Sequence, residues 1–155
     1  MSITKLNNLS ISAVTALPSG VGGKVLQVVT ATDSTRRDTT SSSFVTGSNT
    51  LSVSITPSSA SNKIFLVSHF TQLASANNFF TFYRGATNIG HSSYGLGHSS
   101  NTSHWMVQTI SYLDSPSSTS ALTYQVYFRS TSGTAYLITD QSGGIASITA
   151  FEIGA

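Results

Sequence analysis

The sequence predicts an all-β protein, built as a sandwich of two antiparallel sheets, on three observations. Short segments rich in β-branched and aromatic residues recur at roughly the 8–12-residue spacing that is typical of sandwiches and barrels. Gly, Pro, Asn and Ser gather in turns between these segments. No stretch of useful length has the apolar period of an amphipathic helix. The 155 residues fit one domain, and about eight to ten strands in such a domain favour a jelly roll.

Residues 1–23 differ from the rest and are expected to form a short extended arm before a head domain of residues 24–155. A Pro/Gly-rich run at 18–23 closes the segment as a flexible joint. A disordered tail is one interpretation, because chain termini are commonly disordered. We favour an arm that docks onto a larger assembly, because its spaced apolar side chains would otherwise be exposed to water. The side chains expected to make this attachment are Ile3, Leu6, Leu9, Ile11, Val14 and Leu17.

In the first half of the head, strands are predicted at 25–29, 44–45, 51–55 and 63–73, with a polar loop over 31–43. Segment 51–55 alternates apolar and polar side chains, which indicates one buried face and one wet face. Pro57 has no N–H to give a ladder and therefore ends that strand. The chain restarts at Lys63, and four apolar residues in a row at 64–67 indicate a strand that is covered on both faces.

In the second half, strands are predicted at 79–84, 105–113, 122–128, 135–138 and 145–153. Segment 122–128 alternates cleanly, whereas 79–83 is apolar on both faces. The links between strands are a hairpin at 85–88, a long Gly/Ser/Asn/His loop at 90–103 and a turn at 114–120. Trp105 opens a strand, which favours a place in the core.

The strands that are apolar on both faces, 64–67, 79–83 and 105–112, predict self-association. A monomeric sandwich wets one face of each sheet, and exposed apolar surface costs about 25 cal/mol per Å². A large exposed apolar patch usually marks an interface. Alternatively, these positions line a thick core or lie under long loops. The side chains expected at the interface between copies are Phe65, Val67, His69, Phe80, Phe82 and Tyr112.

Composition excludes several classes of function. Charged residues make up 8% of the chain, far below the usual share of about 25%, and the net charge is +2. No cluster of basic residues indicates nucleic-acid binding, because the adjacent pair at 36–37 is flanked by two aspartates. The chain has no Cys, so disulfides and Cys-based metal sites are excluded. We expect no membrane insertion, because no apolar run reaches 18 residues, and the N-terminus lacks the pattern of a signal peptide.

Nothing in the sequence predicts an enzyme or a cofactor. The five acidic residues are not paired at a spacing that suggests glycosidase carboxylates, and there is no GxSxG motif. His91, His98 and His104 lack the tight spacing of a metal motif. Aromatic faces and hydroxyl-rich loops suit glycans, and loops on a rigid sandwich commonly carry recognition. The candidate receptor-contacting residues are Asn77, Asn78, His91, Tyr94, His98, Asn101 and His104.

Five segments carry a resemblance to a known family: GKVLQVV (23–29), ITPSSASNKI (55–64), YRGATNIG (83–90), YLDSPSSTSALTYQVYF (112–128) and ITAFEI (148–153). They resemble a domain common in tail-fibre and virion structural proteins of tailed bacteriophages, notably those of aquatic bacteria and cyanobacteria. The resemblance runs from residue 23 to the C-terminus. It implies a trimeric jelly-roll head, similar to complement and tumour-necrosis-factor-like domains, and it supplies no catalytic residues.

The resulting expectation is a virion structural protein, made in the host cytoplasm, whose homotrimeric head attaches the particle to host-surface glycans. The arm would join other virion proteins. Fibre proteins are often long, whereas only about 23 residues precede this head, which suggests a short fibre or a tip protein. The alternative is a capsid decoration or cement protein of the same fold that stabilises the shell and reads no receptor. A free lectin or a depolymerase is a third hypothesis.

Overall fold

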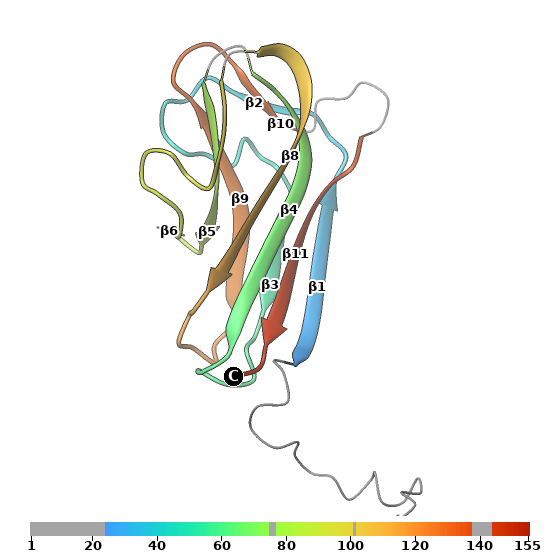
Figure 1. Ribbon diagram of the computed structural model, residues 1–155, viewed down its shortest axis with the longest axis vertical. Helices are drawn as coiled ribbons and strands as arrows, with labels where there is room; N and C mark the ends of the chain where they lie inside the picture. Colours follow the sequence, from blue (N-terminus) through green and yellow to red (C-terminus); the bar gives the residue numbers. More distant parts are fainter. Residues whose placement is uncertain (1–23, 75–76, 101, 138–143) are drawn as a thin grey trace, which may run out of the picture.

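Every strand pair is antiparallel, and the strands form two sheets packed face to face (Figure 1). The structure is a computed structural model that describes residues 24–74, 77–100, 102–137 and 144–155. Within these ranges all regular secondary structure is β. The predicted all-β sandwich of two antiparallel sheets is therefore confirmed. The side chains expected to attach the arm lie outside the described residues: Ile3, Leu6, Leu9, Ile11, Val14 and Leu17.

The first sheet runs in the order β1-β11-β4-β8 across its main body, and two short strands extend it beside the end of β4. Its strands are β1 (Val25–Asp33), β11 (Ala146–Ile153), β4 (Lys63–Ala74), β8 (Thr102–Asp114), β10 (Ala135–Leu137) and β2 (Arg37–Thr39). β1 and β2 occupy parts of the segment that was expected to be a polar loop. β4 is an inner strand of this sheet, because β11 and β10 pair with one of its edges and β8 pairs with the other.

The second sheet runs β3-β9-β5, and two short strands continue it along the far edge of β5. Its strands are β3 (Ser52–Ile55), β9 (Leu122–Ser130), β5 (Asn78–Arg84), β6 (Thr87–Asn88) and β7 (Gly97–Ser99). β7 lies within the predicted long loop. The brief strand expected at 44–45 is reduced to a single bridge between Val45 and Phe128.

The core fills the space between the sheets and follows the period of two along each strand. β4 turns Ile64, Leu66 and Phe70 inward, where all three are fully buried. From the second sheet, Phe80 meets Phe70 with ring centroids 4.8 Å apart and Phe128 with centroids 6.3 Å apart. The Phe70–Phe80 contact joins the two sheets, and such aromatic contacts stabilise the core beyond the burial of apolar area.

The prediction of a contact between copies is wrong for three of the six side chains, because these three face inward. Phe80 and Phe82 are fully buried between the sheets. Tyr112 pairs with Leu66 and shares its inward face, and it packs against the core. Trp105 departs from its expectation in the opposite direction, because it is 49% exposed rather than buried in the core.

A buried polar network ties the two sheets together at one end of the sandwich. Asp114, at the end of β8, accepts two hydrogen bonds from Arg84 of β5, at 2.9 and 2.7 Å. The hydroxyl of Tyr124, in β9, donates to the same carboxylate at 2.6 Å. Burial raises the pKa of Tyr124, and its hydrogen bond to the carboxylate raises it further, so the phenol stays protonated. The network therefore satisfies a buried acid with two donors from the opposite sheet.

Candidate functional site

The outer face of the second sheet is partly covered by the chain itself. Residues 89–96, called here the cover loop, link β6 to β7 along the edge of β5 that does not pair with β9 (Figure 1). The amide of Ile89 donates to the carbonyl of Phe82 at 3.1 Å, and the amide of Leu96 donates to that of Phe80 at 2.7 Å. Thr81 is fully buried beneath this cover and donates to Asn88 at 2.8 Å. The outward face of β5 is therefore covered by this loop at Thr81, whereas Tyr83 on the same face packs against Phe44 and Tyr127. This agrees in part with the alternative interpretation, in which the segment lies under a long loop.

His91 and Gly95 shape the cover loop. Their backbones bond to each other in both directions, at 3.3 and 2.9 Å. The Nδ1 atom of His91 accepts from the amides of Ser93 and Tyr94, each at 3.0 Å, and these bonds tie the ring to the backbone of the loop. Gly95 has a φ of +63°, and a Cβ there would collide with the carbonyl of Phe80. A side chain at this position would push the loop away from the sheet.

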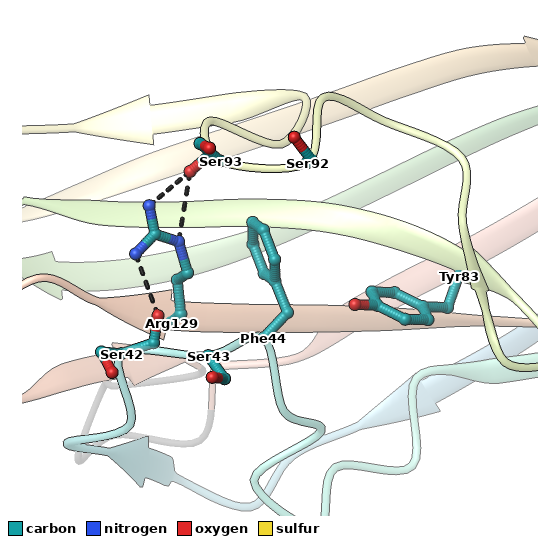
Figure 2. Close-up of a pocket in the computed structure, with 7 residues that line it drawn as sticks. All are labelled: Ser42, Ser43, Phe44, Tyr83, Ser92, Ser93 and Arg129. Carbon is teal, nitrogen blue, oxygen red and sulfur yellow. Dashed lines mark hydrogen bonds between the residues drawn. The ribbon is translucent and has the colours of Figure 1, made fainter.

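Arg129 of β9 joins the cover loop to the 41–44 segment. Its Nε donates to the carbonyl of Ser93 at 3.2 Å, its Nη2 donates to the same oxygen, and its Nη1 donates to the carbonyl of Ser42 at 3.0 Å. The guanidinium lies 4.5 Å from the ring centre of Phe79 and 5.4 Å from that of Phe44. Figure 2 shows it between the two segments, with its hydrogen bonds to both.

A pocket of about 340 Å³ opens at this junction, and we call it the serine pocket. Its lining residues are Ser42, Ser43, Phe44, Tyr83, Ser92, Ser93 and Arg129 (Figure 2). The lining combines hydroxyls, two aromatic rings and one cation, and it contains no carboxylate. It therefore offers hydrogen bonds and ring faces to a polar ligand, and it holds no pair of acids for hydrolysis.

Tyr83 forms one wall of the serine pocket and is held by a second ring. Its ring stacks on Tyr127 with centroids 3.9 Å apart and an angle of 18° between the planes. Burial raises the pKa of Tyr83, and the neighbouring Tyr127 raises it further. The phenol therefore remains a neutral hydrogen-bond donor over the physiological pH range.

Three of the predicted receptor residues gather beside the serine pocket. His98 stacks on Phe79 at 4.7 Å, Tyr94 meets the same ring at 5.8 Å, and His91 stacks on Tyr94 at 4.9 Å. All three predicted side chains are exposed. Because Phe79 also contacts Arg129, this aromatic cluster continues the wall of the pocket.

The other predicted receptor residues lie elsewhere. Asn77 is exposed, and its carbonyl accepts from the amide of Thr131 at 3.0 Å. Asn78 is fully buried, so its prediction as a receptor contact is wrong. His104 is exposed on β8 of the first sheet, and Asn101 lies outside the described residues. Across the described ranges, no group of three or more His, Cys, Asp or Glu side chains could hold a metal ion.

None of the seven residues that line the serine pocket was among the predicted receptor residues. Ser42, Ser43 and Phe44 come from a segment that was read as loop and brief strand. Arg129 occupies an outward position in the alternating strand β9. Arg129 could have been selected from the sequence, because it is an arginine on the solvent-facing side of a strand that also carries tyrosine. Its partners Ser93 and Ser42 could not have been, because they lie 36 and 87 residues away along the chain.

The outer face of the first sheet is open and carries a row of apolar side chains across four adjacent strands. Val28 pairs with Phe151, Phe151 with Phe65, and Phe65 with Leu113. We call these four residues the outer apolar row. Val28 is 52% exposed, Phe65 37% and Leu113 49%. Val67 and His69, also expected at an interface, lie on this same face of β4.

The sequence matches no protein-family model, and no curated protein matches it either. No helix in the described part of the chain is long and apolar enough to cross a membrane.

Proposed function

We propose that this chain is the head of a bacteriophage attachment protein, which binds a host-surface glycan through the serine pocket and self-associates through the outer face of its first sheet. The observation that carries the proposal is the serine pocket itself. It places hydroxyls, backbone carbonyls, two aromatic rings and a fixed arginine around one hollow. Sugars present hydroxyls at their edges and C–H groups on their faces, so they match both kinds of wall.

The pocket also has the rigidity that recognition of a weakly binding polyol requires. Tyr83 and Arg129 stand on neighbouring strands of one sheet, and hydrogen bonds from Arg129 hold both flanking segments. Side chains that are already ordered lose little entropy when a ligand binds. A site on a sheet is also more accurately placed than a site on loops alone.

The order of the strands supports the further proposal that the sandwich is a jelly roll. If the short strands β2, β6 and β10 are set aside, the two sheets read β1-β11-β4-β8 and β3-β9-β5-β7. This is the order that the two Greek keys of a jelly roll produce. The resemblance to trimeric virion domains implies three copies, and the outer apolar row supplies a surface for their contact.

The proposal is tested by binding of the full chain to a panel of host lipopolysaccharides and surface oligosaccharides, with Tyr83→Phe as the test variant. This change removes the pocket hydroxyl and keeps the ring on Tyr127. We expect affinity to fall about 2–10-fold, the equivalent of one neutral hydrogen bond. The control Tyr136→Phe removes a hydroxyl from the first sheet and should bind like the original.

The same panel separates the alternative function. A chain that binds no member of the panel, yet binds the assembled capsid and raises its thermal stability, is a decoration protein. That result would refute attachment through the serine pocket. Turnover of a polysaccharide by the purified chain would instead establish a depolymerase.

A further inference from the structure

We infer that the glycan bound in the serine pocket carries a carboxylate, and that Arg129 binds this group. The inference rests on the proposed function and names the class of sugar: an acidic residue, such as a uronic acid, of a surface polysaccharide.

Arg129 differs from the other arginines in the partners it has. Arg37 pairs with Asp33 at 3.2 Å, and Arg84 pairs with Asp114 at 2.7 Å. Arg36 is exposed and lies over the ring of Tyr136. Within the described ranges, Arg129 is half-buried and has no carboxylate partner. Its charge is thus partly removed from water without a counter-charge, and a bound anion would supply one.

The hydrogen bonds of Arg129 leave donors for a ligand. A guanidinium has five N–H groups, and Nε, Nη1 and Nη2 each donate one to a backbone carbonyl of Ser42 or Ser93. One N–H on each terminal nitrogen remains. Because these acceptors are neutral carbonyls, the positive charge stays available to a ligand in the pocket.

The guanidinium is held in place before any ligand arrives. The rings of Phe44 and Phe79 lie within 5.4 Å of it, and two backbone segments accept its protons. A fixed planar fork suits a planar carboxylate, and little entropy is lost when the pair forms. No acidic side chain lines the pocket to repel an anion. The serine hydroxyls beside Arg129 remain free to contact the hydroxyls of the same sugar.

The size of the pocket fits this ligand. About 340 Å³ lies at the lower end of the range for small-molecule sites, which corresponds to about one or two sugar rings. A single acidic sugar within a longer polymer could therefore place its carboxylate on Arg129, with its neighbours outside. The exposed Tyr94 and His98 are then positioned to contact those neighbouring residues.

The inference is tested by calorimetry of the full chain with an oligogalacturonate and with the same oligosaccharide after its carboxyl groups are reduced to alcohols. We expect the acidic form to bind at least about tenfold more tightly at low salt. The difference should shrink between 50 and 500 mM NaCl, because salt screens the attraction at a half-exposed site. This comparison needs no variant, so it does not depend on the folding of one.

Variants then assign the preference to Arg129. Arg129→Gln should abolish the tenfold preference, whereas Arg36→Gln removes the same charge from the link between β1 and β2 and should keep it. Arg129→Lys keeps the charge but cannot hold both segments, so it should retain only part of the preference. A preference unchanged in Arg129→Gln overturns the assignment.

The remaining outcomes separate this inference from the proposed function. Equal binding of the acidic and reduced forms, or binding of neutral panel members alone, overturns the inference and leaves the attachment function standing. A phosphorylated sugar that binds more tightly than the carboxylated one also overturns it, in favour of a phosphate ligand. No binding to any glycan, acidic or neutral, refutes both.

Discussion

Replacing Glu152 by Gln should destabilise the sandwich, although the two side chains have nearly the same shape. Glu152 lies near the end of β11 and is only 1% exposed. Its Oε1 accepts from the amide and hydroxyl of Ser58, at 2.6 and 2.8 Å, and from Asn62 at 2.6 Å. Its Oε2 accepts from Gln27 at 2.7 Å. One carboxylate thus fastens the 56–62 link to β1 and β11.

The cost of Glu152→Gln follows from these four bonds. Hydrogen bonds to a charged group contribute about 1.5–3 kcal/mol, against about 0.5–1.5 kcal/mol for neutral pairs. In Glu152→Gln, the new side-chain NH₂ group also faces the side-chain NH₂ group of Gln27, so that a donor meets a donor. The Gln27 group already donates to the carbonyl of Thr56 at 2.8 Å. We therefore expect a loss of about 2–4 kcal/mol, a large part of the usual 5–15 kcal/mol stability of a domain.

The pH dependence gives this prediction a second readout. Burial by itself raises the pKa of Glu152, but the hydrogen bonds from Asn62, Gln27 and Ser58 outweigh it and hold the pKa at about 2, below the ordinary value of 4.5. The stabilisation by this carboxylate is therefore fully present above pH 4.5 and is lost as the pH falls toward 2. The stability of the original chain should approach that of Glu152→Gln over this interval.

Urea denaturation followed by circular dichroism at pH 7, 4.5 and 2.5 measures both effects. Asp38→Asn, which changes an exposed acid on β2, is the matched control and should shift stability by less than about 0.5 kcal/mol. A difference between the original and Glu152→Gln that stays constant from pH 7 to 2.5 would contradict the role of the charge. So would a variant as stable as the original at pH 7.

Three further predictions concern the other structural features. Leu113→Asp, in the outer apolar row, should weaken self-association at least about tenfold by light scattering, because a charge replaces apolar area that the proposed contact between copies would bury. Thr123→Asp on the second sheet should leave the mass unchanged. Asp114→Asn should lower the free energy of unfolding in urea by about 2–3 kcal/mol, because it leaves the charge of Arg84 unpaired. Combining it with Arg84→Met should recover part of this loss, and strictly additive effects of the two changes would argue against the pairing. Gly95→Ala should lower stability by about 1–3 kcal/mol and weaken glycan binding, and unchanged binding would show that the cover loop does not shape the pocket.

The sequence predicts the strands well where polar and apolar residues alternate. The alternation at 51–56 and 122–129 gives both the strands and their buried faces correctly, because a period of two leaves one choice of face. The run at 79–83 leaves that choice open, because nearly every position in it is apolar. Phe80 and Phe82 were assigned to the outer face for this reason, whereas they point into the core.

The cover of a strand's second face depends on distant parts of the chain, which periodicity does not reveal. The outward side chains Phe79 and Thr81 of β5 are buried, whereas most of the outward side chains of β4 and β8 are exposed. The sequence does not distinguish the outward face of β5 from those of β4 and β8, because all three strands carry apolar residues on both faces. The serine pocket has the same origin, since Arg129 bonds to Ser42 and Ser93, which lie 87 and 36 residues away along the chain. His91 and Tyr94, which were predicted as receptor contacts, share the cover loop with Ser92 and Ser93 but do not line the pocket.

The two outer faces of the sandwich thus have different properties, and this decides how the proposed oligomer would act. The outer apolar row lies on the first sheet, and the serine pocket lies on the outer side of the second. Copies that pack through the first sheet therefore leave every pocket facing away from the contact. Several pockets on one rigid head would bind neighbouring repeats of a polysaccharide, so that a weak single contact becomes a strong attachment. An interface formed through the second sheet would instead block the pocket, so the surface that Leu113→Asp disrupts bears directly on attachment.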